Sequence, residues 1–117
     1  MLDAWSARPG AFPDEVRAAH VAAFRDPATV HAICEEYRAA ATLDVADDDA
    51  GRGRSRTECP TLVLGSAAGP VGQWYDPIAI WRDWATDVRG APVPGGHFLP
   101  EEAPDETLRH LLAPPAE

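Results

Sequence analysis

The 117-residue sequence contains no lysine, only two cysteines and no long hydrophobic run. All ten basic residues are arginines and stand against 19 acidic residues, so the net charge is −9 at pH 7. Phosphate backbones and anionic membrane surfaces are bound through basic patches, which such a chain lacks. We therefore expect it to bind neither nucleic acid nor a membrane surface.

Several further absences narrow the class of protein. Cys34 and Cys59 form no CxxC or Cys/His spacing, so we expect no zinc site and a reducing, cytoplasmic setting. The segment from Asp47 to Glu58 has the length of a calcium loop, but Gly51 and Arg52 stand where its ligands and its glycine belong. No basic stretch followed by apolar residues opens the chain, which predicts no signal peptide. We expect no metal and no cofactor.

The first half of the chain has helical patterns. The sequence predicts helices over 14–24 and over 27 to about 43, with Asp26 as the N-cap of the second and proline at its first position. A charged, glycine-containing linker is expected next, up to about residue 57. The apolar positions of the second helix share one face, namely Val30, Ile33, Cys34, Tyr37 and Ala41.

The second half predicts a strand–helix–strand–helix order. TLVLGS (61–66) is typical of a buried parallel strand, and APVPG (91–95) of a second one. Between them, Asp76-Pro77 begins a helix, and the last helix is expected over 101–112. This is a right-handed βαβ unit, in which ligands bind beyond the carboxyl ends of the strands.

His97 follows the second predicted strand directly and is the strongest candidate site residue. Histidine is the usual general base near neutral pH, and Gly95 and Gly96 would let the backbone approach a pocket closely. The alternative is a structural histidine that caps the final helix. We assign Glu101 and Glu102 to the positive end of that helix rather than to catalysis.

Other aromatic and histidine residues have two interpretations each. Tyr37 either packs in the core or donates a hydrogen bond from its phenol into a pocket. Trp5 either packs or lines a pocket wall. Packing roles are expected for the remaining tryptophans and surface positions for the remaining histidines, namely Trp74, Trp81, Trp84, His20, His31 and His110.

A complete catalytic triad cannot be assembled from this sequence. It contains no GxSxG or GxDxG nucleophile elbow and no glycine-rich phosphate loop after a strand. Ser66 ends the strand TLVLGS, but nothing around it resembles an elbow. Asp76, the nearest acid to the end of that strand, is expected only to cap its helix.

Three segments together resemble one family. HAICEEYRAAATLD, CPTLVLGS and YDPIAIWRDWATDVRGAPVPGGHFLPEEAPDETL are similar to the C-terminal part of haloacetate dehalogenases, α/β-hydrolases of the fluoroacetate dehalogenase type. The resemblance implies a C-terminal fragment of an α/β-hydrolase fold. It assigns residues 1–57 to a partial helical cap with its linker, and residues 58–117 to the last two strands and their helices.

The resemblance also implies a chemistry. In that family an aspartate displaces the halogen and forms an ester, and a histidine oriented by a second acid activates water to cleave it. His97 matches the water-activating histidine, Tyr37 the halide-binding tyrosine of the cap, and Trp5 a tryptophan near the substrate channel. The nucleophile and the orienting acid have no match here, so we expect the isolated chain to be inactive.

Three interpretations of the function remain open. The first is a haloacetate dehalogenase-type hydrolase, acting on a small haloacid with release of halide. The second is another α/β-hydrolase, such as an epoxide hydrolase or esterase. The third is a non-catalytic truncated remnant. If the core sheet is incomplete, the strand TLVLGS has an open edge, and a homodimer becomes possible.

Overall fold

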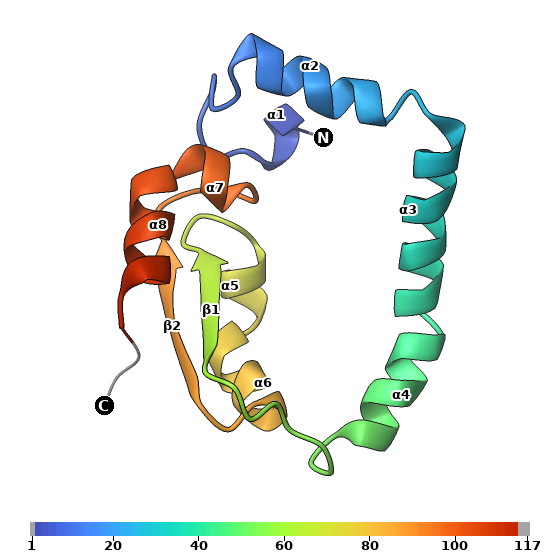
Figure 1. Cartoon of the computed structure of the whole chain (residues 1–117), viewed down its shortest axis with the longest axis vertical. Helices are drawn as coiled ribbons and strands as arrows, with labels where there is room; N and C mark the ends of the chain where they lie inside the picture. The colour runs from blue at the N-terminus through green and yellow to red at the C-terminus, as the bar shows by residue number, and fades with distance from the viewer. Residues whose placement is uncertain (1, 115–117) are drawn as a thin grey trace. The chain divides into compact units, whose positions relative to one another are not determined.

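The computed structural model describes residues 2–114, which form two compact units. One unit contains residues 12–55. The other combines residues 2–11 with residues 56–114. Figure 1 shows the elements in chain order: α1 Leu2–Trp5, α2 Asp14–Ala23, α3 Pro27–Ala40, α4 Leu43–Gly51, β1 Thr61–Ser66, α5 Val71–Trp74, α6 Pro77–Trp84, β2 Val88–Val93, α7 Leu99–Glu102 and α8 Pro104–Leu112.

The unit of residues 12–55 is helical. The predicted N-cap is confirmed, because Oδ1 of Asp26 accepts a hydrogen bond of 2.9 Å from the backbone N–H of Ala28. The predicted linker is wrong over most of its length, since Leu43–Gly51 is the helix α4. The segment consists mainly of aspartate and alanine and contains no proline, and the helix ends at Gly51 with Arg52 as its C-cap. The turn that follows contains Gly53 at φ +72°.

The apolar stripe expected along α3 is not buried. No residue of α2, α3 or α4 is buried, and Tyr37 is 67% exposed. The buried side chain of this unit is Phe12, whose ring meets His20 edge-on at 5.8 Å. Core packing of Tyr37, one of its two interpretations, is therefore wrong.

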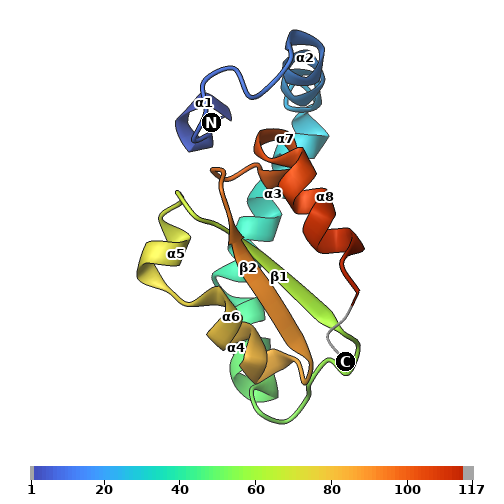
Figure 2. The same ribbon diagram turned by 90° about the vertical axis from the view of Figure 1, so that its left-hand side faces the viewer.

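The other unit is built on a two-stranded parallel sheet. β1 pairs with β2 in the register Thr61↔Val88 to Ser66↔Val93. Helices α5 and α6 lie on one side of the strands and α8 on the other (Figures 1 and 2). The predicted βαβ unit is confirmed, although β2 begins at Val88, three residues earlier than expected.

Two local features shape this unit beside its small core, a close strand contact at Gly90 and the cap of α6. Gly90 brings β2 close to its surroundings, because a Cβ there would overlap the Val63 carbonyl and lie 2.9 Å from Cγ1 of Ile78 on α6. Asp76 caps α6 as predicted, with its Oδ1 accepting from Ala79 N–H at 3.0 Å. The buried apolar side chains of this unit are those of Ala11, Val63, Ala85 and Val93.

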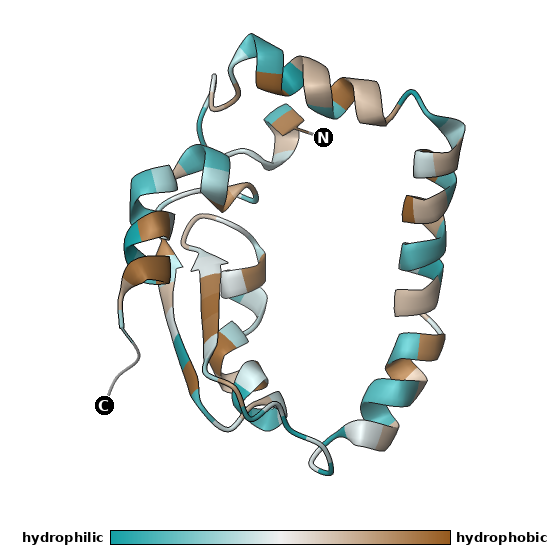
Figure 3. Cartoon of the chain, in the orientation of Figure 1, coloured by the Kyte–Doolittle hydropathy of each residue, from teal (hydrophilic) through white to brown (hydrophobic). Residues whose placement is uncertain are grey.

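Many large apolar side chains of this unit stay exposed. Trp74 is 70% exposed and Trp81 is also exposed, so the packing role predicted for them is wrong. The helices cover the sheet with one face only, and these two side chains lie on other faces. The same holds for α8, where the predicted apolar side of Leu108, Leu111 and Leu112 is exposed. Figure 3 shows hydrophobic colouring along β1 and near the C-terminal end of α8.

Among residues 2–114, no helix is long and apolar enough to cross a membrane.

Candidate functional site

The loop after β2 is fixed to the end of β1. The hydroxyl of Ser66, the last residue of β1, donates a 2.6 Å hydrogen bond to the carbonyl of Gly95. The backbone N–H of Ala67 donates to the carbonyl of Val93 at 2.9 Å. These bonds extend the pairing of the two strands into the loops at their carboxyl ends, where parallel sheets place their sites. Ser66 therefore has a structural role here.

His97 lies in this loop with its side chain exposed. Its backbone N–H donates to the carbonyl of Trp5 at 2.9 Å. Its ring meets the Trp5 ring at 4.8 Å and the Phe98 ring at 5.0 Å, both edge to face. Within residues 2–114, no hydrogen bond or ion pair engages the two imidazole nitrogens. The imidazole is thus held by aromatic contacts, with both nitrogens open to a reaction partner.

Trp5 therefore lies beside His97 in the structure although the two residues are far apart in the sequence. Residues 2–11 belong to the same unit as the strands, and α1 ends at Trp5. Its side chain is 45% exposed while it contacts His97. This exposure does not fit a buried packing role, and the pocket-wall interpretation of Trp5 stays a prediction. The role as a substrate-channel residue stays a prediction.

Glu102 is the residue that sequence reasoning missed. Its side chain is 6% exposed, and its carboxylate accepts three backbone N–H groups. Oε2 accepts from Ala7 at 2.7 Å and from Gly96 at 3.0 Å, while Oε1 accepts from Phe98 at 3.1 Å. Only the bond from Phe98, the N-cap of α7, belongs to the helix-end role that we assigned to Glu102. The other two bonds join the His97 loop to the N-terminal segment.

A signal for Glu102 is present in the sequence but ambiguous. A carboxylate five residues after His97 can turn back to the loop if the helix between them is one turn long. The sequence predicted one helix over 101–112, whereas α7 ends at Glu102 and α8 starts at Pro104. Because the sequence did not predict the break between the two helices, we placed both Glu101 and Glu102 at the start of a single helix.

The glycine pair allows a close approach, but not to the pocket that the sequence predicted. A Cβ at Gly96 would overlap the backbone nitrogen of Ala7 and lie 2.6 Å from the Trp5 carbonyl oxygen. A Cβ at Gly95 would be 3.2 Å from Cδ2 of Leu99, a milder contact. The close approach is to the chain's own N-terminal segment.

The pKa of Glu102 lies below its ordinary value of 4.5. Burial alone raises it, but the hydrogen bonds from the N–H groups of Gly96, Phe98 and Ala7 and from the Ser6 side chain lower it further than burial raises it. These bonds favour the charged form, because only the carboxylate accepts from all these donors.

Acidification should therefore destabilise the chain through Glu102. A carboxyl whose pKa is lower in the folded state stabilises the fold fully above its unfolded pKa, and this stability is lost as the pH falls through the folded value. The loss should begin below about pH 4.5. Urea unfolding midpoints of the chain and of Glu102→Gln should converge as the pH falls below that value. If the difference between the two urea midpoints stays constant down to pH 3, ~1.5 pH units below the point where the loss should begin, the assignment is contradicted.

Tyr37 lies on α3, in the unit of residues 12–55, with its phenol exposed. His97 and Trp5 lie together in the other unit. The halide-binding role of Tyr37 stays a prediction, and its exposure leaves the phenol hydroxyl able to donate to a ligand.

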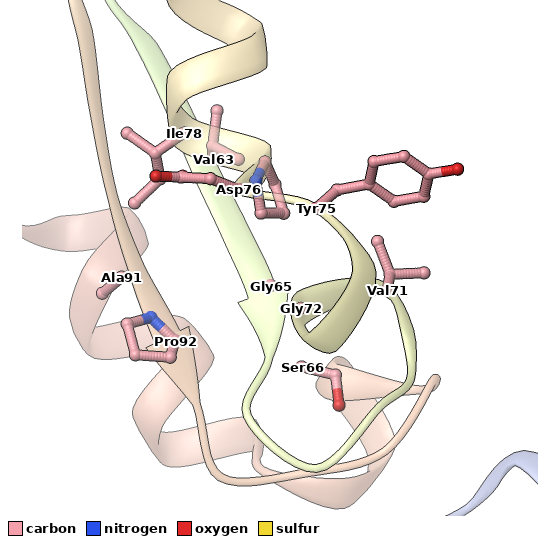
Figure 4. A pocket seen from close by; sticks show the side chains of 11 residues that line it. Val63, Gly65, Ser66, Val71, Gly72, Tyr75, Asp76, Ile78, Ala91 and Pro92 are labelled. Atoms are coloured by element: carbon pink, nitrogen blue, oxygen red, sulfur yellow. The ribbon is translucent and has the colours of Figure 1, made fainter.

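A pocket of about 370 Å³ lies beside β1 (Figure 4), and His97 is not among its lining residues. Its walls come from β1, α5, α6 and β2. The polar groups among its lining residues include Ser66, which bonds Gly95, and Asp76, which caps α6. Its lining is otherwise mainly apolar, and in residues 2–114 no group of three or more histidine, cysteine, aspartate or glutamate residues could hold a metal ion.

The chain is similar to known proteins in sequence and in structure. No family model matches the chain. It is 38% identical over 88 residues, 75% of its length, to a fluoroacetate dehalogenase from a Burkholderia species. Its structure matches a proposed α/β-hydrolase from Nostoc sp PCC 7120, with a TM-score of 0.87 and 44% identity over 94% of this chain. The chain is part of an α/β-hydrolase fold.

Other α/β-hydrolase matches fit this conclusion. A proposed epoxide hydrolase from Pseudomonas aeruginosa, also solved as a mutant with bound MFA, has a TM-score of 0.74 and 42% identity over 89% of this chain. A proposed acyltransferase from Salmonella enterica has a TM-score of 0.87 and 35% identity. The resemblance to the C-terminal part of haloacetate dehalogenases is thereby confirmed.

The match is partial in every case. The chain spans 29% of the length of the Burkholderia dehalogenase and 38% of the Nostoc α/β-hydrolase. Its two parallel strands with helices on both sides are thus a portion of the sheet of an α/β-hydrolase. The activity of a whole protein that contains this portion is therefore a proposal.

Proposed function

We propose that this chain supplies the histidine-bearing part of a haloacetate dehalogenase-type hydrolase. The observation that carries the proposal is the position of His97: an exposed imidazole at the carboxyl end of β2, held against Trp5, with both nitrogens open. The similarity to a fluoroacetate dehalogenase supports the choice of chemistry.

The chemistry needs groups that this sequence does not contain. An aspartate oxygen attacks the carbon that bears the halogen, and halide leaves with the electrons of the broken bond. His97 then takes a proton from water, and the resulting hydroxide attacks the carbonyl of the aspartyl ester. The bond between the carbonyl carbon and the alkoxy oxygen breaks, and the alkoxide takes the proton of the new aspartic acid, which frees the hydroxy acid and restores the aspartate. His97 then releases its proton to water. A second carboxylate is needed to orient the imidazole.

Two further residues of this chain take part in the proposal. Tyr37 donates its phenol hydroxyl to the departing halide, and Trp5 forms a wall of the substrate channel. Neither side chain is buried, which leaves both able to meet a small haloacid. The proposed ligands are a haloacid and its halide ion, and no cofactor is required.

The second candidate is another α/β-hydrolase activity. The Pseudomonas neighbour, a proposed epoxide hydrolase, favours it, because its identity to this chain is comparable to that of the dehalogenase. Epoxide opening and dehalogenation both use an aspartate nucleophile and a histidine base, whereas an esterase uses serine. The nucleophile in the rest of the enzyme, serine or aspartate, therefore distinguishes an esterase from an epoxide hydrolase or a dehalogenase.

Location and assembly are also proposals. Cys34 and Cys59 are free and exposed, which supports a reducing, cytoplasmic setting. Within residues 2–114, β1 and β2 pair only with each other, and each keeps an open edge. Open edges and exposed leucines on α8 support self-association of the chain as a homodimer when it is alone.

A hybrid enzyme tests the proposal. In it, this chain replaces the matched part of the Burkholderia fluoroacetate dehalogenase, which supplies the remaining fold. We expect the hybrid to release fluoride from fluoroacetate over many turnovers, and the isolated chain to release none. A folded hybrid that hydrolyses epoxides but not fluoroacetate would favour the second candidate. A folded hybrid inactive on both would overturn the proposal.

A further inference from the structure

The bonds of Glu102 reach backbone groups on both sides of His97. Gly96 and Phe98, the two neighbours of His97 in the sequence, each donate a backbone N–H to this one carboxylate. The Phe98 bond fixes the peptide unit that follows His97, and the Gly96 bond fixes the unit between Gly95 and Gly96, so the carboxylate restrains the loop on both sides of His97. The carboxylate itself is buried, so water competes little for the same N–H groups.

The third bond of Glu102 reaches the segment that contacts the imidazole. Ala7 N–H donates to Oε2 at 2.7 Å, two residues after Trp5. Trp5 in turn accepts the His97 N–H through its carbonyl and meets the imidazole with its ring. The carboxylate therefore joins the loop of His97 to the aromatic wall beside it.

We propose that Glu102 is a positioning residue, which holds His97 against Trp5 in the orientation that the base requires. It touches no reacting atom and acts through the backbone. The proposal rests on the proposed function of His97 and deepens it by naming the residue that fixes the base. Within residues 2–114 the imidazole ring has no polar partner that could do so.

The decisive variant is Glu102→Gln in the full chain. Glutamine has the same shape but only one acceptor oxygen, so at least one N–H bond must be lost and its NH₂ group meets another donor. We expect the nuclear Overhauser contacts between the Trp5 and His97 rings to weaken at least twofold, while the far-UV circular dichroism stays unchanged. Asp105→Asn, on the exposed start of α8, removes the same charge and should keep those contacts.

A second measurement needs no variant, in case Glu102→Gln fails to fold. When the pH of the unmodified chain is lowered, the amide resonances of Ala7, Gly96 and Phe98 should shift together with one shared midpoint. A folded Glu102→Gln chain with unchanged Trp5–His97 contacts would overturn the proposal, and so would three amides with separate midpoints.

In the hybrid enzyme, Glu102→Gln should lower kcat at least tenfold with little change in KM, since a misdirected base slows water attack but not substrate binding. An unchanged kcat would count against the positioning role. The failure of the proposed function is recognised separately: it would leave turnover unchanged in His97→Asn, while the ring contacts and the amide titration still decide the role of Glu102.

Discussion

Replacing His97 with asparagine should make the hybrid enzyme accumulate as its aspartyl ester after one halide has been released. Asparagine cannot take a proton from water, so the aspartyl ester forms but is not hydrolysed. Loss of a general base slows this step by about 10²–10⁴-fold. We expect a burst of about one fluoride per enzyme molecule, followed by a steady rate reduced to that extent. Rapid-quench measurement of fluoride, with mass spectrometry of the protein for the trapped ester, provides the test.

The matched control is His31→Asn on α3. His31 is an exposed histidine with 75% of its side chain accessible, 3.8 Å from Glu35, and no role is proposed for it. This variant should keep the full steady rate. The burst also separates the two halves of the reaction, because the nucleophile lies outside this chain. Unchanged steady turnover in His97→Asn would remove His97 from the mechanism, and loss of the burst as well would give it a role in the first step.

The sequence predicted the elements that local signals define. Asp26-Pro27 and Asp76-Pro77 mark helix starts, and both aspartates cap as expected. The apolar run of β1 and the position of His97 after β2 were found for the same reason: the pattern lies within a few residues. The helix α4 was missed because its acidic sequence has the composition of a solvated linker.

Contacts between distant parts of the chain could not be predicted in this way. The bond of Ala7 to Glu102 spans 95 positions, and no periodicity in a single sequence encodes it. The apolar stripes led to wrong predictions of burial for a related physical reason. A stripe predicts a face that can be covered, whereas the exposure of Tyr37 and Trp74 shows that this chain of 117 residues does not cover every such face by itself. A chain that spans little more than a third of its structural neighbours leaves such faces open.

Replacing Gly96 with alanine should disrupt the His97 loop more than any other single methyl group added to it. The new Cβ would overlap the Ala7 backbone nitrogen, lie 2.6 Å from the Trp5 carbonyl oxygen and lie 2.8 Å from Oε1 of Glu102. Two of these three atoms are backbone, so no side-chain rotation relieves the contact. Overpacking of this kind costs about 1–3 kcal/mol, and here the N-terminal segment can also be displaced.

The expected result is a lowered urea midpoint together with loss of the Trp5–His97 contacts, because residues 5–7 must move away from the loop. Gly95→Ala is the matched control one position earlier. Its Cβ would meet only side-chain atoms at 3.2 Å or more, and Leu99 can turn to make room. We expect its midpoint to stay close to that of the unmodified chain. Equal midpoints and intact ring contacts in both variants would show that residues 5–7 do not pack on the loop, and the described link between the N-terminal segment and His97 would then be wrong.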